Sequence, residues 1–204
     1  MSEEYSITFQ KFMQIVNNSE PENFIKGLLF CFGAPTIKGI KAATLINFKR
    51  GNENLKNIWN SSAPKFLHKT GIEYILLNEF THSKNALVLI FRRNLIHRAI
   101  TSPEALNLLN ELNYPVPNIN KCLEFMQKKF INEFPHEIGI FLDYPPEDVR
   151  GFMSDKNNKN YASGYWKVYG ADENIIKRAE KIFMQYKRAE YDAAKKILNN
   201  LQLV

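Results

Sequence analysis

The sequence predicts an α+β fold: a small, mostly antiparallel sheet of about four strands, covered by six to eight helices, with a long C-terminal helix. Three observations support this prediction. Several segments repeat apolar residues at helical spacing, two adjacent segments resemble a β-hairpin, and the strand–helix alternation of a doubly wound fold is absent. With 45% apolar residues the chain can build a substantial core, so a disordered chain is a poor interpretation.

The first fifty residues predict two helices and a strand. Residues 6–17 carry one apolar stripe at helical spacing. The segment from Ser19 to Glu22 supplies an N-cap, an early proline and a capping-box glutamate for a second helix. That helix should end near Gly33, because glycine tolerates a left-handed C-cap. The turn-rich segment GAPTIKGIK then leads into a strand in AATLINFK, residues 42–49.

A β-hairpin follows, formed by IEYILLNEF and NALVLIFRR, residues 72–80 and 85–93. The second strand is apolar at every position from Ala86 to Phe91. We therefore expect both of its faces to be covered, as in a central strand with helices on at least one side.

The remaining residues predict mainly helices. Ser102 and Pro103 start one helix, and another runs from Ile119 to Phe130. Two short helices should begin at Pro135 and at Pro145-Pro146. SGYWKVYG, residues 163–170, predicts a strand, and one long helix runs from Ala171 to about Asn200.

Composition narrows the class of partner. The net charge of +6 is spread evenly, since residues 1–50, 51–170 and 171–204 each carry an excess of two basic residues. A nucleic-acid surface concentrates such residues, so we do not expect a nucleic-acid partner. The acidic N-terminus is unlike a signal peptide, and no early apolar run is long enough to span a membrane. We expect a cytoplasmic protein, with Cys31 and Cys122 as buried thiols.

FPHEIGIFLDYPPEDVRGF, residues 134–152, is the first candidate functional segment. Helix capping explains most of its conspicuous residues, but it does not explain His136, Glu137 and Tyr144. His136 and Glu137 are candidate catalytic residues that orient a ligand or exchange a proton. A zinc-protease motif is excluded because position 140 is Ile, and we assign no metal ligands, although a metal cluster assembled in space stays open. The alternative is a capped corner between two helices.

Two further segments are candidates for ligand binding. GAPTIKGIK offers Thr36 and Lys41, where turn amides and an ammonium could hold an anion, although it lacks the spacing of a phosphate-binding loop. Its alternative role is to stop a helix. NYASGYWKVYG offers Tyr165, Lys167 and Tyr169, and such rings could stack on a base, a flavin or a porphyrin. Alternatively, these rings pack the C-terminal helix against the sheet.

The segments APTIKGIKAATL, FPHEIGIFLDYPPEDVRGF and YASGYWKVYG together resemble a bacterial family of uncharacterised proteins, domain of unknown function 3793. The resemblance covers about residues 20 to 187. From the predicted elements and the end of the resemblance, we expect a single α+β domain over residues 1–186 and a helical extension over residues 187–204, through which a homo-oligomer could form. The resemblance implies a link to iron or redox metabolism. Where the family usually has Gly before Tyr-Pro, this chain has Asp143.

Our leading hypothesis is that the fold brings these three segments to one pocket, which binds a small anionic or aromatic ligand, such as a redox or tetrapyrrole cofactor. In it, Lys41 and Lys167 offset ligand charge and the tyrosines contact a ring. The sequence identifies no particular cofactor. An alternative is a regulatory module without catalytic activity that docks a protein or nucleic acid. A third is an enzyme that uses His136 as acid or base.

Overall fold

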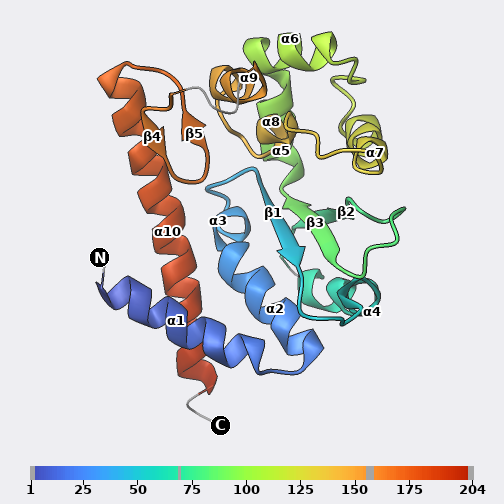
Figure 1. Cartoon of the computed structure of the whole chain (residues 1–204), viewed down its shortest axis with the longest axis vertical. Coiled ribbons are helices and arrows are strands. Elements are labelled where there is room, and N and C mark those ends of the chain that lie inside the picture. The colour runs from blue at the N-terminus through green and yellow to red at the C-terminus, as the bar shows by residue number, and fades with distance from the viewer. Residues whose placement is uncertain (1–2, 69, 155–158, 202–204) are drawn as a thin grey trace.

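The computed structural model describes residues 3–68, 70–154 and 159–201, and within them it confirms the α+β fold (Figure 1). The helices described are α1 Glu3–Asn17, α2 Pro21–Phe32, α3 Ala34–Ile37, α4 Leu55–Leu67, α5 Arg93–Thr101, α6 Pro103–Glu111, α7 Ile119–Lys129, α8 Ile138–Phe141, α9 Pro146–Ser154 and α10 Glu173–Leu201. The strands are β1 Ala43–Phe48, β2 Glu73–Leu76, β3 Ala86–Phe91, β4 Ala162–Ser163 and β5 Lys167–Val168.

The main sheet is antiparallel, with strand order β1-β3-β2. This order confirms β3 as the central strand, and helices cover both of its faces. Val88 and Ile90 point into a cluster built with α2 and α4, whereas Leu89 and Phe91 point into a second cluster built with α5 to α8. Successive side chains of a strand point to opposite faces, so an entirely apolar strand supplies both clusters.

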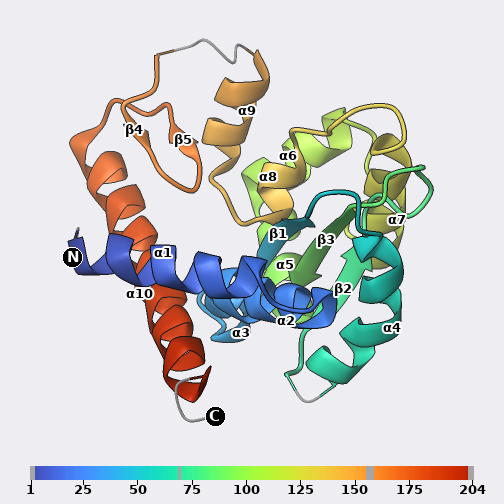
Figure 2. The ribbon, with the colours of Figure 1, turned by 60° about the horizontal axis from the view of Figure 1, so that its bottom comes forward.

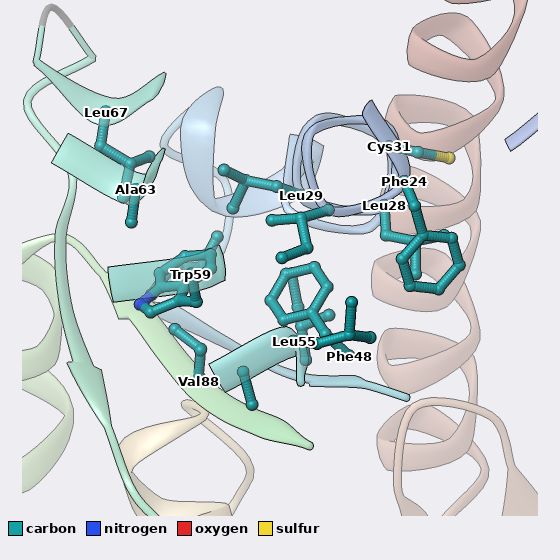
Figure 3. Packing of buried hydrophobic residues seen from close by; sticks show 14 of the residues in the cluster. Phe24, Leu28, Leu29, Cys31, Phe48, Leu55, Trp59, Ala63, Leu67 and Val88 are labelled. Carbon is teal, nitrogen blue, oxygen red and sulfur yellow. The ribbon is translucent and has the colours of Figure 1, made fainter. Parts of the chain in front are cut away.

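Large aromatic side chains fill the first cluster (Figure 3). Trp59 of α4 stacks on Phe48 of β1 with ring centroids 5.2 Å apart, and neither side chain is exposed. Cys31 of α2 lies on the side of this cluster that faces α10, and its thiol donates to the Glu190 carbonyl oxygen at 3.7 Å. Both cysteines are buried, as predicted.

The long helix α10 connects two parts of the molecule (Figures 1 and 2). Towards its N-terminal end, Phe183 and Tyr186 pack with Trp166 and Val168 of the β4–β5 hairpin in a third cluster. Towards its C-terminal end, Ala194 belongs to the first cluster. Helix α1 crosses α10, and the Tyr191 hydroxyl donates to Glu4 Oε1 at 2.5 Å. One helix therefore joins the hairpin to the sheet domain.

Several local predictions were wrong. SGYWKVYG is not one strand, because Ser163 ends β4 and residues 164–166 form the turn to β5. Gly33 ends α2 in a right-handed conformation, with φ of −76°, and the left-handed glycine of that segment is Gly39. A Cβ at Gly33 would lie 2.7 Å from Ile90 Cδ1, so its small size matters there.

Helices α4 and α5 were not predicted at all. Helix α4 contains an internal Pro64, and α5 follows β3 with no side-chain cap on its first turn. Helix α5 lacks the start signals on which the other assignments depended. Helix α4 has such a signal, which the sequence interpretation overlooked, because the Asn54 side chain caps it by accepting from the Asn57 amide at 3.2 Å.

Candidate functional site

A cavity of about 440 Å³ lies between the α8–α9 corner and the β4–β5 hairpin. Aromatic side chains make up much of its wall, and these are Phe134, Tyr144, Phe152, Tyr165 and Trp166. His136, Asp148, Ser163 and Lys167 are its polar lining residues. The cavity thus brings together two of the three candidate segments from the sequence.

The corner between α8 and α9 depends on close packing. A Cβ at Gly139 would lie 2.7 Å from Val149 Cγ2, so glycine lets the two helices approach each other. Asp143 then reverses the chain with φ of +65°, a conformation that favours glycine, and the Tyr144 amide donates to the Gly139 carbonyl at 2.9 Å. This turn directs the Tyr144 ring to the cavity.

Asp148 joins α9 to the β4–β5 hairpin. Its buried carboxylate accepts a hydrogen bond from Trp166 Nε1 at 2.9 Å and another from the Tyr169 amide at 2.7 Å. These bonds fix the indole that forms one wall of the cavity. Asp148 is therefore a structural residue, and Lys167 and His136 remain as the ionisable side chains of the wall.

Lys41 lies behind this wall and is only 4% exposed. Its ammonium is 5.6 Å from the ring centroid of Tyr144 and 5.4 Å from those of Tyr165 and Tyr186. Across the described ranges, the Lys41 side chain makes no hydrogen bond and no ion pair within 4.0 Å. Burial lowers the pKa of Lys41 to about 8, although Glu190 and Asp143 act in the opposite direction.

Glu190 of α10 is the buried carboxyl partner of this lysine. Burial raises its pKa to about 7, while hydrogen bonding with Tyr165 and the charges of Lys41 and Lys187 lower it. Asp143 is exposed, so water screens its charge, and we treat Glu190 as the principal counter-charge. Lys41, Glu190 and the tyrosines thus form a buried ionisable cluster that shares Tyr144 and Tyr165 with the cavity.

The three candidate segments therefore lie side by side, because Lys41 contacts Tyr144 and Tyr165. His136, Tyr144, Tyr165 and Lys167 line the cavity. His136 contributes to an aromatic cluster, since its ring centroid lies 5.1 Å from that of Phe152.

Three other candidate residues lie outside the lining of the cavity. Glu137 is 3% exposed, and its Oε1 accepts from the Tyr114 hydroxyl at 3.0 Å and from the Lys129 ammonium. Thr36 is buried with its hydroxyl 2.8 Å from that of Thr44, and Tyr169 packs against Gly151. These contacts give Glu137 and Thr36 structural roles, and a catalytic role for Glu137 stays a prediction.

Comparison with known proteins now bears on the family resemblance. Residues 29–204 match the family described as protein of unknown function (DUF3793). The chain belongs to this family. No curated protein and no solved structure matches the chain.

All cavity residues of this DUF3793 member, together with Lys41 and Glu190, lie within the matched range. The match also continues beyond residue 187, and Glu190, Tyr191 and Ala194 of the proposed extension are buried. The division of the chain at residue 187 stays a prediction.

Sequence reasoning missed two central groups of this DUF3793 site. Glu190 and Tyr186 sit on the buried stripe of α10, four residues apart. A carboxyl on an otherwise apolar stripe was the available signal, since a buried acid needs a partner. Which partner it meets could not be read from the sequence, because Lys41 is far away along the chain.

Metal ligation finds no support in the parts of this DUF3793 chain that are described, where no group of three or more His, Cys, Asp or Glu side chains could hold an ion. Similarly, none of the described helices has the length and apolar character needed to cross a membrane.

Proposed function

We propose that this cytoplasmic protein binds a small, flat ligand that combines an aromatic ring with an acidic group. The observation that carries the proposal is the cavity itself, in which five aromatic side chains surround a space of about 440 Å³. Small-molecule sites are typically concave and apolar, with a few polar groups, and occupy about 300–1,000 Å³. Aromatic redox cofactors belong to this ligand class.

The charged groups of the wall favour an acidic ligand. Lys167 lies at the wall with its ammonium 5.6 Å from the Phe152 ring centroid, and Asp148 already accepts two hydrogen bonds. The wall therefore presents an ammonium next to aromatic faces. A ring would stack on Tyr144, Tyr165 or Trp166, and its acidic group would lie near Lys167.

Two measurements test for such a ligand. Native mass spectrometry and absorbance spectra of the purified protein would reveal a retained molecule. Titration with naphthoate would then follow the fluorescence of Trp166, which lines the cavity, whereas Trp59 lies in the first cluster. The Trp59→Phe variant leaves Trp166 as the single reporter. If no retained mass is found and the fluorescence of Trp166 does not respond to naphthoate, the proposal is contradicted.

The first prediction concerns Lys167. Lys167→Ala should weaken naphthoate binding about fivefold to tenfold, because a partly exposed ammonium contributes roughly 1 kcal/mol to holding a carboxylate. Binding of neutral naphthalenemethanol should change less than about twofold. Lys181→Ala, an exposed lysine of α10, is the matched control. Equal affinity of the folded Lys167→Ala variant for naphthoate would contradict this role.

A protein-interaction module is the second candidate function. A groove of about 630 Å³ lies among α1, α2, α3 and α10, with Ile15, Phe30, Ile37 and Ile197 in its lining. It includes the C-terminal part of α10, where the sequence suggested a homo-oligomer. A defined oligomer without ligand in native mass spectrometry would favour this candidate.

A further inference from the structure

We propose that Lys41 is a nucleophilic lysine that forms a reversible imine with an aldehyde or ketone group of the cavity ligand. This inference rests on the proposed function, since the ligand would reach Lys41 from the cavity between Tyr144 and Tyr165. Lys41 itself is not part of the cavity lining; it contacts the two rings that are.

The position of Lys41 is unusual for a structural lysine. Its ammonium is buried against three tyrosine rings, and within the described ranges no oxygen atom accepts a hydrogen bond from it. A buried ammonium without an acceptor is costly, because aromatic faces replace only part of its hydration. The surroundings therefore raise the fraction of the neutral amine, which is the nucleophilic form, above that of an exposed lysine.

The charges around Lys41 favour a carbonyl over a second anion. The two carboxyl groups whose charges act on Lys41 are Glu190 of α10 and, more weakly, Asp143 of the α8–α9 corner. An acidic group next to Lys41 would meet both carboxyls, and like charges in one site repel each other. A neutral carbonyl carbon avoids this repulsion. The acidic group of the same ligand would instead lie near Lys167, at the wall of the cavity.

Glu190 is placed to move the protons that imine formation requires. The lone pair of neutral Lys41 attacks the carbonyl carbon, and the proton lost from nitrogen passes to oxygen to give a carbinolamine. Protonated Glu190 then donates to the hydroxyl, which leaves as water. Loss of water leaves an iminium ion, and the Glu190 carboxylate recovers its proton from the iminium nitrogen to give the imine, so no oxidant or reductant is consumed.

Among the described residues, five ionisable groups interact electrostatically with Glu190. They are Tyr5 of α1, Cys31 of α2, Lys41, Tyr165 of the hairpin turn and Lys187 of α10. The pKa of Glu190 is about 7 and that of Lys41 about 8, so both protonation states of each group are accessible near neutral pH. Because burial lowers the pKa of Lys41, a larger fraction of it is neutral near neutral pH than of an exposed lysine.

A path to Lys41 depends on the hairpin turn. Tyr165 follows Ser163 and Gly164, which are exposed, and the flanking strands β4 and β5 have two residues each. Tyr165 is itself only half-buried. We infer that a shift of this short turn moves the ring aside and admits the carbonyl.

The test is reductive trapping with 4-carboxybenzaldehyde, which combines an aromatic ring, a carboxylate and a carbonyl. The protein is treated at pH 7 with limiting aldehyde and cyanoborohydride, and labelled lysines are identified by peptide mapping. Lys41 should be labelled at least tenfold faster than exposed Lys181. Lys41→Arg keeps the charge and should lose this fast phase, and 4-carboxybenzyl alcohol should give no label.

Two results would overturn the inference: labelling spread evenly over the surface lysines, or Lys41 labelled in urea but not in the folded protein. The mapping uses the unaltered chain, so it does not depend on the folding of a variant. Naphthoate has no aldehyde or ketone group and cannot form an imine, so its binding to the Lys41→Arg variant measures the cavity site apart from imine formation. If the protein binds naphthoate but Lys41 is not trapped, the imine inference fails and the proposed function stands. If the protein neither binds naphthoate nor is trapped at Lys41, the imine inference and the proposed function both fail.

Discussion

At the scale of single residues, Lys41 and Glu190 are a buried pair whose charges are poorly compensated. Lys41 is 4% exposed and Glu190 is 7% exposed. Such a pair stabilises a fold weakly, because removing two charges from water opposes their mutual attraction. Stability alone is therefore a poor explanation for the pair, which is why we propose a chemical role for it.

We expect the pair to shape the pH dependence of stability. The raised pKa of Glu190 means that the folded state holds its proton more tightly, so the free energy of unfolding falls from about pH 4.5 to pH 7. The lowered pKa of Lys41 means that the unfolded state binds the proton more tightly, so stability rises from about pH 8 to pH 10.5. Each change should be on the order of 1–3 kcal/mol.

Urea denaturation across this pH range checks that expectation. Glu190→Gln should remove the fall at acidic pH, and Lys41→Met should remove the rise at alkaline pH. The difference between wild type and each variant isolates the group from other titrating residues. A difference that does not vary with pH would show that the group keeps its ordinary pKa.

At the scale of elements, the β4–β5 hairpin is the part of the cavity wall that depends most on one residue. A Cβ at Gly164 would lie 2.4 Å from Phe183 Cδ2 on α10, so only glycine lets the turn lie against that helix. The same turn carries Tyr165 and Trp166, which line the cavity.

Gly164→Ala should therefore lift the turn from α10. We expect a loss of about 1–3 kcal/mol in the free energy of unfolding, as for overpacking, and weaker naphthoate binding. Gly170→Ala is the matched control, since its Cβ would lie 3.2 Å from the flexible end of Ile175. Thermal melts and Trp166 fluorescence measure the two effects. Equal behaviour of the two variants would contradict the packing role of Gly164.

The elements that the sequence predicted correctly are those with local signals. Helices α1, α2 and α10 carry long apolar stripes, and β3 is apolar throughout. The turn within SGYWKVYG had no such signal. Its alternating pattern resembles a strand, but the segment contains a turn in which Gly164 packs against Phe183. That contact joins two elements far apart in sequence, which periodicity does not report.

At the scale of the whole molecule, α10 holds the site together. It contributes Phe183 and Tyr186 to the third cluster, Glu190 to the buried pair and Ala194 to the first cluster. The sequence indicated Lys41, Tyr144 and Tyr165 as candidates from three separate segments. Their meeting with Glu190 depends on how α10 crosses the fold, and this tertiary arrangement has no signature in any one segment.

Removal of residues 188–204 tests the integral role of α10. The deletion uncovers the faces of α1 and α2 that Tyr191 and Ala194 cover, so we expect the melting temperature to fall by about 10 °C or more. Circular dichroism would follow the melt, with Lys196→Ala as a control at an exposed position. An unchanged melting temperature would instead support a separate extension.

The crossing of α1 and α10 also has a consequence for synthesis on the ribosome. Tyr191 is translated 187 residues after Glu4, its hydrogen-bond partner. At about 5–20 residues per second, this interval lasts on the order of ten seconds or more. During this interval the apolar faces of α1 and α2 that pack against α10 stay exposed on the nascent chain. This exposure favours aggregation, and it gives chaperones that bind apolar segments time to act.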